Sequence, residues 1–109
     1  MARYIEVTTT LDSEEKARII SDFLLENHLA SCVQKIGPVV SKYWWQGKIE
    51  NSKEYILTIK TKENLYKKLE EVIIKLHNYE VPEIIARPII KGYKKYLDWI
   101  EENCSKTKV

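Results

Sequence analysis

The 109-residue sequence predicts an α+β fold in one domain spanning residues 1–109. Segments with strand periodicity alternate with helical segments in the order strand, helix, strand, strand, helix, strand, helix. The two middle strands are separated by a short turn region that contains glycine, which is typical of a hairpin. Hydrophobic residues make up 44% and charged residues 31%, as in ordinary globular domains. Right-handed crossovers in a βαββαβ order produce a ferredoxin-like sandwich, an antiparallel sheet backed by helices, here with an extra C-terminal helix.

The first strand is expected over Tyr4–Thr10, a segment of alternating residues rich in β-branched side chains. A helix then begins at Asp12, which together with Glu15 resembles a capping box, and it ends at about Asn27 or His28. The apolar residues of this helix recur at helical spacing: Ala17, Ile20, Phe23 and Leu24.

The central hairpin begins with one long strand from Ala30 to Trp45. We expect a bend or bulge at Gly37-Pro38, because proline cannot donate a hydrogen bond within a central ladder. The turn lies at Gly47 or at Glu50–Ser52, two alternatives that the pattern leaves open. The third strand runs to Thr61.

The second half of the chain continues with a helix that ends near His77-Asn78, since Pro82 forbids its continuation. A fourth strand over Ile84–Ile90 contains Pro88, which favours a sheet edge. Gly92 precedes the last helix. The stripe of the second helix comprises Leu65, Leu69, Val72, Ile73 and Leu76, and that of the last helix Tyr93, Tyr96, Leu97, Ile100 and Cys104.

Three adjacent aromatic residues, Tyr43, Trp44 and Trp45, stand immediately before the turn region. Alternate strand residues point to opposite faces, so at least one of these rings should leave the core of its own subunit. An exposed indole beside apolar neighbours marks an interface or a ligand groove, whereas the alternative is a strand buried on both faces. The helix-free face of the sheet and this aromatic hairpin favour contact with another subunit.

Five separated segments of the chain together match a known family: Ala30-Ser31-Cys32-Val33, Tyr43-Trp44-Trp45-Gln46-Gly47-Lys48-Ile49-Glu50, Lys60-Thr61, His77-Asn78-Tyr79-Glu80-Val81-Pro82-Glu83-Ile84-Ile85 and Tyr96-Leu97-Asp98-Trp99. In these segments the chain resembles the CutA divalent-cation-tolerance family. The resemblance implies a ferredoxin-like subunit, a homotrimer assembled like the PII signalling proteins, and an association with copper or another divalent cation. Some relatives carry a cysteine at the end of the first strand, where this chain has Val7-Thr8-Thr9-Thr10.

Cys32 and His77 are the candidate metal ligands. We expect Cys32 in the middle of its strand, where it offers a soft thiolate, although a lone cysteine in an apolar strand more often acts as a small hydrophobe. It would need ligands from neighbouring subunits around a symmetry axis. His77 matches a histidine in the family's His-x-Tyr-x-x-Pro motif; the alternative is a cationic side chain that stabilises the end of the second helix. Cys104 is less suited, because it lies in the last turn before a polar tail.

Glu54, Lys60 and Tyr79 are weaker candidates for binding a small polar ligand in a cleft. Glu54 and Lys60 share one face of the third strand, where a solvated or paired surface is the more common arrangement. The sequence contains no Ser-His-Asp set, nucleophile elbow, phosphate-binding glycine loop or HExxH motif, so we expect no enzyme. The CxxC pair of a metallochaperone and an RNP1-like pattern are also missing.

The net charge of +2 is carried by scattered basic residues, which argues against nucleic acid as a partner. The amino terminus lacks an apolar signal segment and no run reaches membrane-spanning length, so we expect a cytoplasmic location and no membrane partner. The expected function is a trimeric protein linked to divalent-cation tolerance, acting by metal binding or as a signalling scaffold. The alternative is a PII-like sensor that binds a small molecule or nucleotide between subunits.

Overall fold

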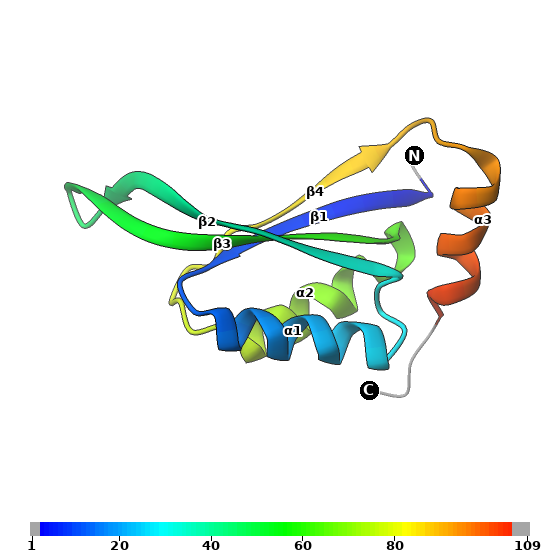
Figure 1. Ribbon diagram of the computed structural model, residues 1–109, viewed down its shortest axis with the longest axis horizontal. Coiled ribbons are helices and arrows are strands. Elements are labelled where there is room, and N and C mark those ends of the chain that lie inside the picture. Colours follow the sequence, from blue (N-terminus) through cyan, green and yellow to red (C-terminus); the bar gives the residue numbers. More distant parts are fainter. Residues whose placement is uncertain (1–2, 106–109) are drawn as a thin grey trace.

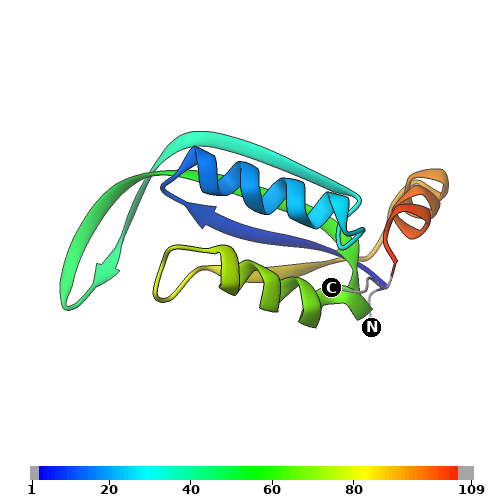
Figure 2. The ribbon, with the colours of Figure 1, turned by 90° about the horizontal axis from the view of Figure 1, so that it is seen from below.

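The computed structural model describes residues 3–105 and confirms the α+β architecture. The four strands form one antiparallel sheet in the order β2-β3-β1-β4. Two helices, α1 and α2, lie side by side across one face of the sheet, while α3 packs at its end (Figures 1 and 2). The elements are β1 (Tyr4–Leu11), α1 (Glu14–Glu26), β2 (Cys32–Trp45), β3 (Lys48–Lys62), the 3-10 helix η1 (Glu63–Leu65), α2 (Tyr66–Leu76), β4 (Ile84–Ile89) and α3 (Lys94–Asn103).

The core lies between the sheet and the two helices. Strand β1 alternates as predicted, with every second side chain buried against α1 and α2. Each fully buried Leu, Ile or Val contributes about 1.5–3 kcal/mol through removal of apolar surface from water. The buried cluster includes Ile5, Val7 and Leu11 of β1, Ala17, Ile20 and Leu24 of α1, Leu57 and Ile59 of β3, and Leu69, Val72 and Ile73 of α2.

Helix α1 starts one residue later than the capping-box interpretation predicts. Ser13 is the N-cap, and its hydroxyl accepts a hydrogen bond of 3.1 Å from the Lys16 amide. The Asp12 carboxylate accepts instead from the Asn78 side-chain amide, at 3.1 Å, so it ties α1 to the segment after α2. The predicted Asp12–Glu15 box is therefore wrong, because two adjacent residues can cap and Asp12 is engaged by a distant partner.

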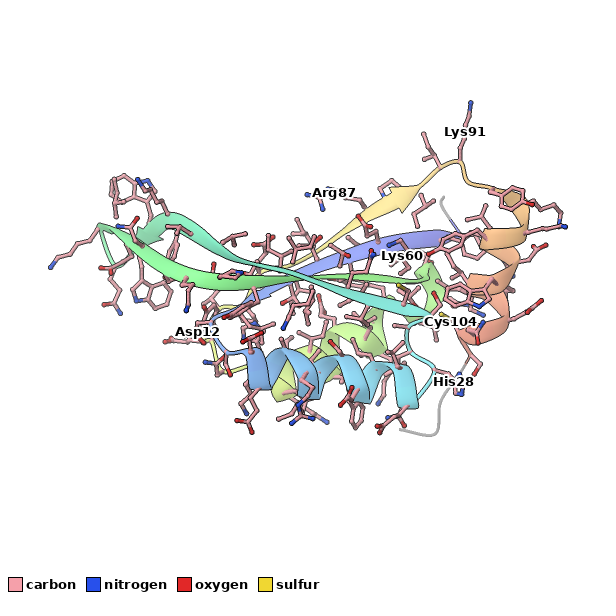
Figure 3. All side chains as sticks on the ribbon, viewed as in Figure 1. Asp12, His28, Lys60, Arg87, Lys91 and Cys104 are labelled. Atoms are coloured by element: carbon pink, nitrogen blue, oxygen red, sulfur yellow. The ribbon has the colours of Figure 1, made fainter. Side chains whose placement is uncertain are left out.

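Helix α3 closes the end of the sheet near the start of β1. Ile100 of this helix is buried and Leu97 is partly buried. Both pack with Leu65 and Tyr4 in a second small cluster. Tyr93 precedes the helix and is exposed, so its assignment to the buried stripe is wrong. Cys104 is not in a loose last turn: it follows the helix and is buried in this cluster. Figure 3 shows Cys104 and His28 at this end of the molecule, far from Asp12.

The long strand β2 contains the predicted irregularity. Its register with β3 shifts between Ile36 and Val39, at Gly37-Pro38. Gly37 has φ +144°, and a Cβ there would lie 2.9 Å from the Glu54 carbonyl oxygen, so only glycine fits without strain. The turn is the two-residue Gln46-Gly47 type with positive φ at both positions, which confirms the first of the two alternatives for the hairpin.

Residues 39–54 form a two-stranded extension that we call the arm. The last residue of β1, Leu11, pairs with Tyr55, so the strands of the arm pair only with each other in the protomer. Figure 1 shows the arm projecting well beyond the helices. An isolated two-stranded ribbon is marginally stable in water, and the arm therefore lacks the packing that fixes the rest of the sheet.

Candidate functional site

Cys32 lies on the helix-free face of the sheet. The strand register aligns it with Lys60, Lys60 with Glu6, and Glu6 with Arg87, so these four side chains form one row across all four strands. Cys32 is half-buried and is the first residue of β2, not a mid-strand residue as expected. Because β2 is an edge strand, a neighbouring subunit can approach this thiol from the side.

Polar contacts tie the rest of this row together. The Lys60 ammonium lies 3.6 Å from a Glu6 carboxylate oxygen and donates to the Gln34 side chain at 3.1 Å. Arg87 donates to the Thr8 hydroxyl at 3.2 Å, and Figure 3 shows Arg87 extending from β4 on the side away from α1 and α2. Sequence reasoning missed Arg87 and Glu6, which only the register across the sheet brings beside Lys60 and Cys32.

His77 is held at the far end of β1. Its Nδ1 accepts the Tyr79 amide hydrogen at 3.0 Å, so Nε2 carries the proton and donates to the Thr10 carbonyl oxygen at 2.8 Å. The residue is only 9% exposed, and burial lowers the pKa of the imidazole below its usual value of 6.5. The alternative role as a cationic helix end is wrong, since the ring is held neutral and bonds to a neighbouring strand.

Tyr79 and Glu54 form the second half of this cluster. The Tyr79 hydroxyl donates to Glu54 Oε2 at 2.6 Å, and the Tyr79 ring lies 4.8 Å from the His77 ring. Burial, and then the hydrogen bond to Glu54, raise the pKa of Tyr79, so the phenol remains a donor. The chain Thr10–His77–Tyr79–Glu54 thus links the end of β1 to the base of the arm.

The structure places Glu54 and Tyr79 together but puts Lys60 elsewhere. Glu54 and Lys60 are six residues apart on β3, a separation of roughly 20 Å along an extended strand. Lys60 belongs to the row beside Cys32, and Glu54 belongs to the arm. One ligand of ordinary size cannot contact both within a protomer.

A groove of about 850 Å³ lies between the arm and the segment that follows α2. It contains all three predicted interface aromatics and both members of the Glu54–Tyr79 pair. The register puts the Tyr43 and Trp45 side chains on the face of the arm that bears Glu54, and the Trp44 side chain on the other face beside Ile49. The lining residues are Thr10, Ser41, Lys42, Tyr43, Trp44, Trp45, Glu54, Asn78, Tyr79, Glu80, Val81, Pro82 and Glu83.

The two predicted metal ligands do not meet in one protomer. Cys32 is level with Glu6 of β1, whereas His77 contacts Thr10, four residues or roughly 13 Å further along that strand. Between residues 3 and 105, no three His, Cys, Asp or Glu side chains are grouped so that they could hold a metal ion. The protomer alone does not fit a metal centre, and both assignments stay predictions.

Comparison with known proteins identifies relatives over nearly the whole chain. Residues 5–103 match the family model described as CutA1 divalent ion tolerance protein. The divalent-cation tolerance protein CutA of Thermus thermophilus is 44% identical over 97 residues, which is 89% of this chain and 94% of that protein. A solved structure of the Thermus thermophilus protein superposes with a TM-score of 0.91 at 42% identity and covers 94% of this chain and 99% of its own.

A plant relative shows that the same domain also occurs in a longer protein. Protein CutA 1, chloroplastic, of Oryza sativa is 37% identical over 99 residues, which is 91% of this chain but 56% of that protein. These names refer to tolerance of divalent cations or to CutA alone, and none describes a reaction. In the part of the chain that the structure describes, no helix is long and apolar enough to span a membrane.

Proposed function

Because this chain belongs to the CutA1 divalent ion tolerance family, we propose that it acts in divalent-cation tolerance as a non-enzymatic cytoplasmic homotrimer. The observation that carries the trimer is the arm, whose apolar side chains stay exposed to solvent in the structure of residues 3–105. Trp44 is 72% exposed there, and large contiguous apolar surfaces are rare on monomers. The exposed apolar residues of the arm are Val40, Tyr43, Trp44, Trp45 and Ile49.

Two other surfaces support assembly. Strands β2 and β4 are the edges of the sheet, so their outer backbone groups are available to a second chain. The face opposite α1 and α2 bears Ile36 and Ile85, both exposed in the protomer. Sedimentation equilibrium at micromolar concentration should show three times the protomer mass, and a monomer would refute the proposal.

For the metal, we propose that copper or another divalent cation binds between subunits with Cys32 as the thiolate ligand. Its position on an edge strand supports this, because a symmetric assembly can bring three copies, or one copy and a neighbour's donors, to one ion. His77 is the proposed nitrogen ligand, although it must first give up its hydrogen bond to Tyr79 or to Thr10. Cys32 is therefore the stronger of the two proposals.

Calorimetry with Cu(I) and Zn(II) on the assembled protein tests the metal proposal. Cys32→Ser should weaken binding at least tenfold, and His77→Ala should weaken it less. Cys104→Ala is the matched control, since this second cysteine is buried in the cluster under α3. Native mass spectrometry should show one or three ions per trimer, and binding should weaken below about pH 6 as protons compete for the ligands. Unchanged affinity in both Cys32→Ser and His77→Ala would refute this site.

The groove favours a second candidate function, a PII-like sensor of a small molecule. Its volume falls in the range of small-molecule sites, and it lies beside the surface proposed to meet a neighbour. Its lining contains three carboxylates and one lysine, so a phosphate-bearing nucleotide is disfavoured as the ligand. Thermal-shift measurements with copper, zinc and nucleotides would separate the two functions, because only a ligand that prefers the folded state raises its stability.

A further inference from the structure

We propose that the groove between the arm and residues 78–83 binds an organic cation, specifically an alkylated ammonium group. The proposal rests on the groove of one protomer and does not depend on the metal site. It rests on the proposed sensor function, for which it names the ligand class, and the acidic lining disfavours a nucleotide as that ligand. Three properties of the groove carry it: aromatic walls, an acidic lining, and a partly free buried carboxylate.

The walls of the groove are aromatic. Three of its lining residues, Tyr43, Trp45 and Tyr79, carry rings on the side of the arm that bears Glu54. A cation over the face of an aromatic ring is attracted by the ring quadrupole, which is worth about 0.5–1 kcal/mol at exposed sites and about 2 kcal/mol where water is excluded. Tryptophan is the best of these rings, and the strand register puts Trp45 on the same face of the arm as Tyr43 and Glu54, with Trp44 on the opposite face beside Ile49. Several rings around one space suit a cation without strong directional hydrogen bonds.

The charge of the lining has the sign that a cation needs. Glu54, Glu80 and Glu83 supply three carboxylates against the single ammonium of Lys42. The charges are arranged at different depths, because Glu80 and Glu83 are exposed and Glu54 is only 5% exposed. The exposed pair draws a cation toward the opening, and Glu54 faces it once it has entered.

Glu54 is the one carboxylate of the groove that is buried. Its Oε2 accepts the Tyr79 hydroxyl at 2.6 Å, and its other oxygen accepts no hydrogen bond from residues 3–105. That oxygen is not sealed in the core, since the only fully enclosed side-chain polar atom without a partner in the described residues is Thr9 Oγ1. Glu54 therefore presents a fixed, partly uncompensated negative charge to the groove, and a buried charge of this kind is stabilised by a counter-ion.

An alkylated ammonium fits this lining better than a metal ion does. A divalent metal needs several oxygen, nitrogen or sulfur ligands converging at about 2.0–2.6 Å. In residues 3–105, no three acidic, His or Cys side chains are grouped in this way. A methylated ammonium is weakly hydrated and large, so it gains from contact with rings and from one nearby carboxylate without a coordination shell.

Choline and its neutral carbon isostere 3,3-dimethyl-1-butanol provide the test, because they share a shape and differ in charge. Each is titrated into the full-length, assembled protein, with calorimetry and tryptophan fluorescence as the two readouts. We expect saturable choline binding with a fluorescence change, and at least tenfold weaker binding of the isostere. Equal binding of both compounds, or no saturable choline binding, would overturn the proposal.

A pair of carboxylate variants locates the site. Glu54→Gln keeps the shape of the side chain and removes its charge, so it should weaken choline at least tenfold and leave the isostere unchanged. Glu71→Gln, an exposed carboxylate on α2 outside the groove, is the matched control and should bind choline as the parent does. Choline binding that Glu54→Gln leaves intact would overturn the assignment.

Sedimentation on the same samples separates this proposal from the trimer. A neighbouring subunit that covers the arm from outside the groove leaves choline binding intact. A neighbouring subunit that fills the groove abolishes choline binding. A trimer that binds no choline therefore overturns the cation proposal alone. A monomer that binds choline overturns the trimer alone. If Glu54→Gln fails to fold, the comparison of choline with its isostere on the parent protein still decides.

Discussion

Strand β3 passes through two contrasting environments. In its second half, Leu57 and Ile59 are fully buried between the sheet and the helices. In its first half, which forms one side of the arm, Ile49 is 62% exposed and opposes the still more exposed Trp44. The difference arises where β1 ends, because Leu11 pairs with Tyr55 and none of the strands or helices within residues 3–105 covers the arm beyond it. The sandwich is complete in one chain, and the arm is suited to contact something else.

The largest effect is expected from a cavity in the sandwich. Leu57→Ala should lower the free energy of unfolding by about 2–5 kcal/mol, the usual cost of truncating a fully buried leucine. Ile49→Ala, on the same strand, should change the folding of the protomer by less than about 0.5 kcal/mol. Urea unfolding at several protein concentrations measures both. Any larger effect of Ile49→Ala should depend on protein concentration, since it would arise at an interface between subunits. If Ile49→Ala lowered the free energy of unfolding as much as Leu57→Ala does, at every protein concentration, the contrast between the arm and the sandwich would be wrong.

The arm itself should respond through assembly. Trp44→Ala or Trp45→Ala should weaken association by about 2 kcal/mol or more, because buried tryptophans are enriched among interface hot spots. Trp99→Ala on α3 is the matched control: Trp99 is as exposed as Trp45 but stacks on Tyr96 in the same helix. Size exclusion and sedimentation report the assembly state. If both arm variants stay trimeric and as heat-resistant as the parent, the interface lies elsewhere.

The same contrast explains how far the sequence could predict the structure. The order, type and approximate bounds of the four strands and three α-helices follow from periodicity, because each has an apolar face that must be buried; the short 3-10 helix η1 was not predicted. The first residue of α1 does not follow from periodicity, because Asp12 and Ser13 are both suitable N-cap residues. The distant Asn78 donates to Asp12, and Ser13 is the N-cap. The bulge at Gly37-Pro38 is predictable because proline and glycine restrict the backbone in known ways.

The candidate site was predictable only in part. Tyr43, Trp44 and Trp45 stand out as an aromatic run, and His77 and Tyr79 as part of a motif. Their convergence with Glu54 on one groove depends on where the segment after α2 passes the base of the arm, which no local pattern encodes. The polar row from Cys32 to Arg87 likewise depends on the register of four strands.

Two buried threonines test whether the sandwich satisfies its own polar groups. Thr61 donates to the Leu29 carbonyl oxygen at 2.7 Å, whereas Thr9 Oγ1 is enclosed without a partner in the described residues. Thr61→Val should cost about 1–2 kcal/mol of unfolding free energy, and Thr9→Val should be neutral or stabilising by up to about 1 kcal/mol. Thermal and urea unfolding compare the pair. A clear loss in Thr9→Val would indicate a partner for this hydroxyl that the protomer does not contain.

The smallest effect is the pH dependence of stability that arises from His77, at the junction between the sandwich and the arm. Burial lowers the pKa of His77 in the folded protein below its usual value of 6.5, so the folded state binds fewer protons than the unfolded state. Stability from this group is therefore fully present above pH 6.5 and declines as the pH falls from that value toward the lowered pKa. Protonation of Nδ1 would remove the acceptor for the Tyr79 amide.

The measurement is the difference in unfolding free energy between about pH 7.5 and pH 5.5 in metal-free buffer, for the parent and for His77→Gln. His28 and the carboxylates Asp12 and Glu54 are present in both proteins, so their contributions largely cancel in the comparison. The parent should lose more stability than the variant as the pH falls. A parent that gains stability relative to His77→Gln on acidification would mean a raised pKa and a cationic imidazole, which would contradict the hydrogen bonds to Tyr79 and Thr10 and restore the role of a charged helix end.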